Sequence, residues 1–161
     1  MSKIDWWIFW LMNKIKLFFV ILLTLSACAY EPMLKNYDFE FKEITFEGDK
    51  FINNILENNL KNRGKGLKKF DLNISTKKER EVVSSNDKGD ATIFNLKIYV
   101  DYQVLKEGQI ILKNSIIKET TYNSIDDKFK LNENENNILN YLSESISSEI
   151  FTSVVSVGEW L

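Results

Sequence analysis

Few side chains in this 161-residue sequence are of types that could carry out covalent chemistry. The absence of histidine excludes histidine-based catalytic triads and histidine metal sites. The single cysteine, Cys28, cannot form an intramolecular disulfide or a cysteine-rich zinc site. The sequence has no glycine-rich phosphate loop and no nucleophile elbow, and its serines have no basic partner. We therefore expect neither enzyme activity nor a bound metal or cofactor.

The one chemically distinctive residue, Cys28, directly follows an apolar segment. Residues 17–27 form an uncharged, mostly apolar run, and Lys14 and Lys16 supply a basic flank. This run is too short for a relaxed transmembrane helix but has the length of a signal-peptide core. Met12 is the predicted biological start, because the residues before it place tryptophans and an acid where a short basic region is expected.

Leu25, Ser26 and Ala27, together with Cys28, resemble a bacterial lipobox, the sequence at which lipoprotein precursors are modified and cleaved. The resemblance implies that the Cys28 thiol receives a diacylglycerol, that a dedicated peptidase cuts before it, and that the new amine can be acylated. Two or three acyl chains make membrane attachment effectively permanent. Residues 1–27 are therefore a predicted lipoprotein signal peptide. The alternative is an uncleaved membrane anchor with an incidental cysteine.

The residues after Cys28 indicate where such a protein resides. Ala29 occupies the position at which aspartate, in lipoproteins that resemble this one, favours retention in the inner membrane. Ala29 is therefore compatible with a lipid anchor in the outer membrane, with the chain on the periplasmic side. Residues 28–37 are a predicted tether, because Pro32 disfavours a helix there. A formal net charge of −2 gives no indication of nucleic-acid binding.

Residues 38–161 are predicted to form a single domain. Alternating apolar residues predict a first strand over residues 39–46, with a bulge near Lys42 where the alternation changes phase. Apolar residues then recur at helical spacing. Asp49 is a typical cap for this helix, and Gly64 is its predicted end.

Two further strands and a polar segment are predicted next. Residues 70–75 alternate as a strand, whereas the charged residues 76–90 are typical of a mobile loop or of the frayed ends of two strands. Residues 91–105 form the longest alternating run. Its packed side holds Thr92, Phe94, Leu96, Ile98, Val100, Tyr102 and Val104, and its other side holds Asn95, Lys97, Asp101 and Gln103.

A turn then reverses the chain into a fourth predicted strand. A three-residue loop that ends with Gly108 in the left-handed conformation sets Val104 opposite Ile110. Further along, the same register sets Ile98 opposite Ile116. A two-residue loop would place apolar residues against polar ones, so the hydrophobic pattern favours the three-residue loop.

The chain closes with a long predicted helix. Asn132, with Glu135 three residues later, is a suitable amino-terminal cap, and Gly158 is the predicted end. Its apolar stripe consists of Ile138, Leu142, Ile146, Ile150 and Val154. The order strand, helix, three strands, helix predicts an α+β two-layer sandwich. Both helices are expected on one face of an antiparallel sheet of about four strands.

Several of these features occur in the same order in a known family. The chain resembles the lipopolysaccharide-assembly lipoproteins, small outer-membrane lipoproteins that sit inside the large barrel which inserts lipopolysaccharide into the outer leaflet. The similarity covers most of the chain after the signal peptide. It rests on the opening Cys28, Ala29, Tyr30, Pro32 and Met33, the helix FINNILENNLKNR, the strand ATIFNLKIYVDYQVL, the turn Glu107–Gly108 and the segment Thr120–Ser124.

The resemblance implies a structural role without catalysis. The expected function is to plug and help assemble the barrel, with a large outer-membrane β-barrel as partner and lipopolysaccharide as a candidate ligand. The alternative is a lipoprotein subunit of another envelope lipid-transport system that binds lipid or a transporter protein.

A plug must present polar surface, because the lumen of an outer-membrane barrel is polar. The expected surfaces are the outward row of the strand over residues 91–105 and three serines of the last helix. These serines are Ser143, Ser147 and Ser148. All of these residues could equally be ordinary solvated positions.

Two clusters of cations could attract the phosphates of a glycolipid. The first consists of Lys61, Arg63, Lys65, Lys68 and Lys69, and the second consists of Lys77, Lys78 and Arg80. The alternative for the first cluster is a favourable interaction with the carboxyl end of the helix dipole. The alternative for both is ordinary solvation.

Replacing the thiol tests the lipid anchor. Cys28→Ser should abolish incorporation of labelled fatty acid, because serine lacks the thiol that accepts the diacylglycerol. The measurement is metabolic labelling with palmitate, followed by immunoprecipitation of the full chain. Labelling that persists in the variant would rule out lipidation at this residue.

Overall fold

The computed structural model describes residues 39–61 and 66–158. The predicted signal peptide, the lipobox with Cys28 and the tether lie outside these ranges. Two of the candidate cations, Arg63 and Lys65, also lie outside the described residues.

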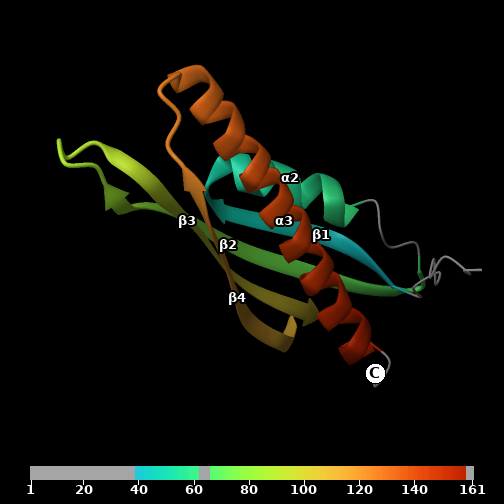
Figure 1. Cartoon of the computed structure of the whole chain (residues 1–161). Coiled ribbons are helices and arrows are strands. Elements are labelled where there is room, and N and C mark those ends of the chain that lie inside the picture. Colours follow the sequence, from blue (N-terminus) through green and yellow to red (C-terminus); the bar gives the residue numbers. More distant parts are fainter. Residues whose placement is uncertain (1–38, 62–65, 159–161) are drawn as a thin grey trace, which may run out of the picture. The chain divides into compact units, whose positions relative to one another are not determined.

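The described residues form four strands and two helices in the predicted order. The elements are β1 (Phe39–Gly48), α2 (Lys50–Lys61), β2 (Lys68–Ser85), β3 (Ala91–Lys106), β4 (Gln109–Asn123) and α3 (Lys128–Gly158). The strands form one sheet in the order β1-β2-β3-β4, and both helices lie against one face of it (Figure 1). The predicted α+β class and element order are therefore confirmed.

The direction of β1 is the one difference in topology. β1 pairs with β2 in parallel, whereas β2 pairs with β3 and β3 with β4 in antiparallel fashion. The sheet is therefore mixed rather than wholly antiparallel. The cause is α2, which carries the chain back along the sheet, so that β2 starts beside the start of β1.

The predicted details of β1 and the start of α2 are confirmed. The β1–β2 register shifts between Phe41 and Glu43, which leaves Lys42 as the bulged residue. The Asp49 carboxylate caps α2, accepting hydrogen bonds from the backbone N–H groups of Phe51 at 3.0 Å and Ile52 at 3.1 Å.

The junction of β1 and α2 lies directly against β2. Gly48 has a φ of 99°, and a Cβ atom there would lie 1.9 Å from the Thr76 carbonyl oxygen. Next to it, the backbone N–H of Asp49 donates to Thr76 Oγ1 at 3.0 Å. The Thr76 hydroxyl in turn donates to Asn53 Oδ1 at 2.7 Å, and both side chains are buried. This buried polar contact fixes where α2 leaves the sheet.

Strand β2 is much longer than predicted. It continues to Ser85 and pairs with β3 along the added length. The mobile-loop alternative for residues 76–90 was therefore wrong over residues 76–85, and the alternative of two strand ends is nearer, although these ends are paired rather than frayed. This part of β2 has polar side chains on both faces, and apolar alternation therefore cannot reveal it. The remaining residues make a tight turn, in which the Asn86 side-chain oxygen accepts from the N–H groups of Lys88 and Asp90.

The predicted register between β3 and β4 was wrong. The loop has only two residues, Glu107 and Gly108, with φ values of 53° and 79° as a type I′ turn requires. The extra residue is Ile111 instead, where the register shifts and β4 bulges. Val104 consequently faces Leu112. Moving the extra residue from the loop into the strand leaves the apolar residues on the same face.

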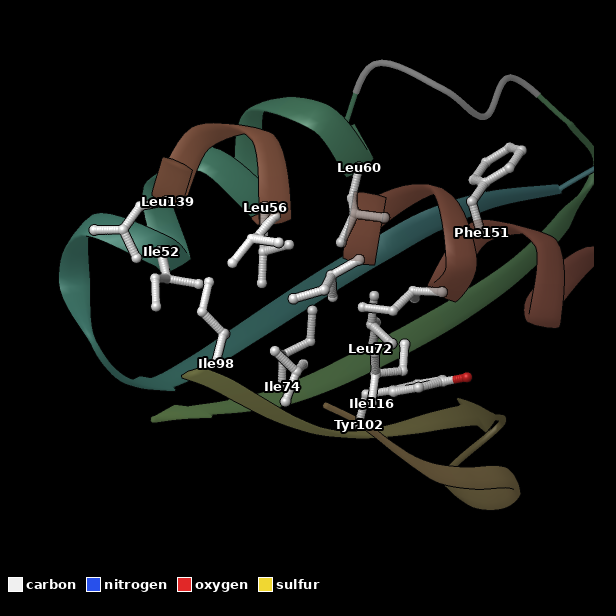
Figure 2. Packing of buried hydrophobic residues seen from close by; sticks show 14 of the residues in the cluster. Ile52, Leu56, Leu60, Leu72, Ile74, Ile98, Tyr102, Ile116, Leu139 and Phe151 are labelled. Atoms are coloured by element: carbon white, nitrogen blue, oxygen red, sulfur yellow. The ribbon is translucent and has the colours of Figure 1, made fainter. Parts of the chain in front are cut away.

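The core lies between the helices and the inner face of the sheet. Figure 2 shows residues of β2, β3 and β4 beneath side chains of α2 and α3. Leu72, Ile98, Ile52, Leu56 and Ile146 are completely buried. Burial of each such side chain contributes roughly 1.5–3 kcal/mol. The alternation predicted for β3 and most of the stripe predicted for α3 are confirmed, since Leu142, Ile146, Ile150 and Val154 are buried.

Helix α3 begins earlier than predicted. The Asp127 carboxylate caps it, accepting from the N–H of Phe129 at 2.9 Å and of Lys130 at 3.3 Å. Asn132 is therefore inside the helix rather than its cap. Neither α2 nor α3 combines the length and apolar character that a membrane-spanning helix would need within the described ranges.

Two glycine substitutions, one at the junction of β1 and α2 and one in the turn after β2, separate the effect of a steric clash from that of backbone strain. Gly48→Ala should lower the free energy of unfolding by about 3 kcal/mol, because the new Cβ meets the Thr76 carbonyl in a strained backbone conformation. Gly89→Ala is the matched control: its φ is 88°, but nothing lies within 4 Å of the new Cβ. It should lower that free energy by about 1 kcal/mol. Urea denaturation measures both, and equal losses would contradict the clash.

Candidate functional site

The candidate site is the face of the sheet that no described helix covers, which we call the uncovered face. Its cross-strand rows are Thr45, Asn73, Gln103 and Lys113; Glu47, Ser75, Asp101 and Ser115; Lys77, Tyr99 and Ile117; Glu79, Lys97 and Glu119; and Glu81, Asn95 and Thr121. The outward row predicted for β3 therefore lies on one surface with polar residues of the other strands. Ile117, which is 58% exposed, is the one large apolar side chain among them.

Two shallow hollows adjoin on this face. One of about 350 Å³ lies over Thr45, Asn73 and Gln103, and one of about 270 Å³ lies beside Lys77 and Tyr99. Both are lined in part by Ser75 and Asp101. The uncovered face is therefore hollowed where its polar rows meet.

Ion pairs and hydrogen bonds connect neighbouring strands across the uncovered face. Glu79 of β2 accepts from the hydroxyl of Tyr99 of β3 at 3.0 Å and also pairs with Lys77 of its own strand at 2.6 Å. Lys97 of β3 pairs with Glu119 of β4 at 2.9 Å. The Ser115 hydroxyl also donates to Asp101. Such cross-strand pairs hold the polar side chains in place.

These contacts shift the pKa values of the groups that make them. The hydrogen bond from Lys77 lowers the pKa of Glu79, and the hydrogen bond from Lys97 lowers the pKa of Glu119. The same bonds raise the pKa values of Lys77 and Lys97. At neutral pH these four groups are therefore all charged, and their charges are matched in pairs.

The candidate cations do not form one site. Lys61 pairs with Glu57 on α2, and Lys69 pairs with Glu40 of β1 at 3.2 Å. Residues 69 and 77 of an extended strand are roughly 27 Å apart. The second cluster is itself divided, because Lys77 lies on the uncovered face whereas Lys78 and Arg80 point to the opposite side of β2.

Most of the described candidate cations already have a partner in the chain. Besides Lys61, Lys69 and Lys77, Arg80 pairs with Glu135 at 3.1 Å. Lys68 lies at the start of β2 and also makes an interaction of its own. Lys78 is exposed, and no carboxylate of the described residues lies within ion-pair distance of it.

The partner of Arg80 belongs to a small cluster that joins α3 to the sheet. The Arg80 guanidinium lies 4.3 Å from the centre of the Phe94 ring. Glu135, besides pairing with Arg80, accepts a hydrogen bond from the Tyr122 hydroxyl at 2.9 Å. From the sequence, Glu135 was predicted to take part in the amino-terminal cap of the last helix. Its position one turn before the apolar residues Ile138 and Leu139 was the available signal that it faces the sheet.

The serines of α3 are not a common surface. Ser143 and Ser147 are completely buried, so the expectation that they present polar surface was wrong. The Ser147 hydroxyl donates to the Glu144 carbonyl at 2.7 Å, within the helix. Only Ser148 of the three is exposed. Within the described residues there is also no cluster of acidic, cysteine or histidine side chains that could hold a metal ion.

Bacterial lipoproteins of known structure share this fold. Rare lipoprotein B from Shewanella oneidensis is 14% identical, with a TM-score of 0.57 over 72% of this chain and 96% of its own. A minor lipoprotein from Acinetobacter baumannii is 14% identical, with a TM-score of 0.55 over 74% and 92%. Lipoprotein B from Nitrosomonas europaea is 16% identical, with a TM-score of 0.59 over 78% and 90%. No protein-family model and no curated protein sequence matches the chain. The likeness therefore establishes the fold.

The cluster around Glu135 makes stability depend on pH in alkali. Burial and the hydrogen bond to Glu135 raise the pKa of Tyr122 from 10.0 to about 12. The neutral phenol is the form that the fold favours. Its contribution is therefore complete below pH 10.0 and is lost as the pH rises through about 12.

Tyr122→Phe should therefore reduce the fall in the free energy of unfolding between about pH 10 and pH 12. Urea denaturation at several pH values measures that fall. Tyr141→Phe is the control, because this tyrosine is 71% exposed and its removal should leave the fall unchanged. An unchanged fall in Tyr122→Phe would contradict the assignment.

Proposed function

We propose that this protein is an outer-membrane lipoprotein that plugs, and helps to assemble, the barrel which inserts lipopolysaccharide into the outer leaflet. The observation that carries the proposal is the contrast between the two faces of the sheet. One face is buried beneath α2 and α3, and the uncovered face is polar, hollowed and carries ion pairs.

The uncovered face has the chemistry that a barrel lumen requires. The interior of an outer-membrane barrel is polar, so a plug needs hydrogen-bonding groups rather than an apolar patch. Carboxylates, amides, lysines and hydroxyls alternate across the rows of this face. Because the cross-strand pairs already position many of them, less side-chain freedom is lost on binding.

The remaining parts of the proposal are the lipid anchor and the glycolipid. A diacylglycerol on Cys28 would hold the protein at the periplasmic surface of the outer membrane. The fold is shared with proteins described as rare lipoprotein B and minor lipoprotein, which is consistent with such an anchor.

Lipopolysaccharide is a proposed further ligand. Lys78 could bind a phosphate without losing a carboxylate partner among the described residues. Lys61, Lys69, Lys77 and Arg80 would each have to exchange a partner.

Copurification in a mild detergent tests the proposed function. The full chain should recover a very large outer-membrane barrel. Ser75→Trp, which places a large side chain where the two hollows adjoin, should reduce that recovery about tenfold, equivalent to about 1.4 kcal/mol of binding free energy. The readout is the amount of barrel recovered per amount of lipoprotein.

Ser145→Trp is the matched control. It makes the same substitution at an exposed serine of α3, in the other layer, and should leave barrel recovery unchanged. Equal recovery with both variants would contradict a role for the uncovered face. Recovery of an inner-membrane ATPase complex without a barrel would favour the alternative, a subunit of another envelope lipid-transport system.

A further inference from the structure

The two edges of the sheet differ in how well they are protected. β1 forms one edge and is interrupted by its bulge at Lys42. β4 forms the other, and from Leu112 to Asn123 its register with β3 is continuous. Figure 1 shows β4 as the outermost strand, and no described residue pairs with its outer edge. Long, regular edges are templates for pairing with another strand.

Two hydrogen bonds establish which backbone groups of β4 point to the outer edge. The N–H of Ser124 donates to the Thr92 carbonyl at 2.8 Å, so this residue faces β3. The N–H of Ser115 is instead bound by the side chain of Asn114 at 2.9 Å, so it faces outward. The direction of the backbone N–H groups alternates along a strand. Outward N–H groups therefore belong to Lys113, Ser115, Ile117, Glu119 and Thr121.

We propose that β4 pairs with β4 of a second copy of this chain, in antiparallel fashion, about a two-fold axis at Ile116. The sheets of the two copies would then join into one continuous sheet. In this register Ser115 lies opposite Ile117 of the second copy. The outward N–H of Ile117 gains a carbonyl acceptor, and the N–H of Ser115 exchanges the Asn114 side chain for one. The axis also places the two copies of Ile116 next to each other on the inner face. This side chain is already buried in each copy, with 3% of its surface exposed.

The charges along the edge of β4 indicate that the strand which pairs with it is a second copy of β4. Lys113 and Glu119 are equally spaced on either side of Ile116, so self-pairing sets each lysine opposite the glutamate of the second copy. Opposite charges directly across an antiparallel pair stabilise it, and like charges weaken it. Both side chains lie on the uncovered face, where Glu119 already binds Lys97 and has a second carboxylate oxygen for another cation.

Other registers lose this complementarity. With the axis at Ser115, Lys113 would face Ile117, and with the axis at Ile117 it would face Thr121. With the axis midway between two residues, side chains of the uncovered face in one copy would lie opposite side chains of the inner face in the other. The axis at Ile116 is therefore the one that continues both faces and pairs the charges.

The test is the protein mass of the full chain, purified in a mild detergent, measured by light scattering that separates protein from detergent. The wild-type chain should reach twice the mass of one copy as its concentration rises. Lys113→Glu should raise the dissociation constant about tenfold, because it sets like charges opposite each other twice in the symmetric pair. Adding Glu119→Lys to that variant should restore pairing.

A backbone substitution tests the edge itself. Ile117→Pro removes an outward N–H without removing a bond to β3, so it should abolish pairing and leave the fold intact. Ile117→Thr keeps the N–H and should pair as the wild type does. Circular dichroism and thermal melting check that each variant is folded.

Three results would overturn the proposal. They are a wild-type chain that has the mass of one copy at every concentration, a proline variant that pairs as well as the threonine variant, and a double charge swap that fails to restore the loss in Lys113→Glu. None of these depends on recovery of a barrel, so failure of this inference is distinguishable from failure of the proposed function.

Discussion

Both helices of the described residues pack against the same face of the four-stranded sheet, and this constraint organises the domain. Where a strand lies beneath α2 and α3 it must alternate, with apolar residues toward the helices and polar residues on the opposite side. β3, at the centre of the antiparallel part, shows this most completely: Leu96, Ile98 and Val100 are buried, whereas Lys97 and Tyr99 are on the uncovered face. The polar surface available for a partner is thus a direct consequence of where the core lies.

Alternation explains how much of the fold could be predicted from the sequence. It identified β3, the bulge at Lys42 and the apolar stripe of α3, because each is a local pattern of one strand or helix. It could not identify the direction of β1, which depends on the path of α2 across the sheet. It also placed the extra residue of the last hairpin in the loop rather than at Ile111, because both positions keep the same residues inside.

The candidate site was predictable only in part, for a related reason. The outward row of β3 followed from its pattern, but its partners did not. Glu79 lies on the part of β2 that has no apolar period, and Glu119 lies on β4, whose register with β3 was predicted wrongly. The extension of β2 was missed because a strand with two polar faces has no apolar period. Glu135 was assigned to a cap because its spacing from Asn132 fits one, whereas its real partners lie on β2 and β4.

The contact of Gly48 and Asp49 with Thr76 has a consequence for the order of folding. It joins residues 27 apart in the sequence, so it can form only after the whole crossover has closed. The hairpins that connect β2, β3 and β4 need much shorter loops. We therefore expect the three-stranded meander to assemble early and β1 with α2 to dock late. Contacts between distant residues are the slow ones to form, which makes the β1–α2 unit the part of this domain most exposed to misassembly while the chain folds.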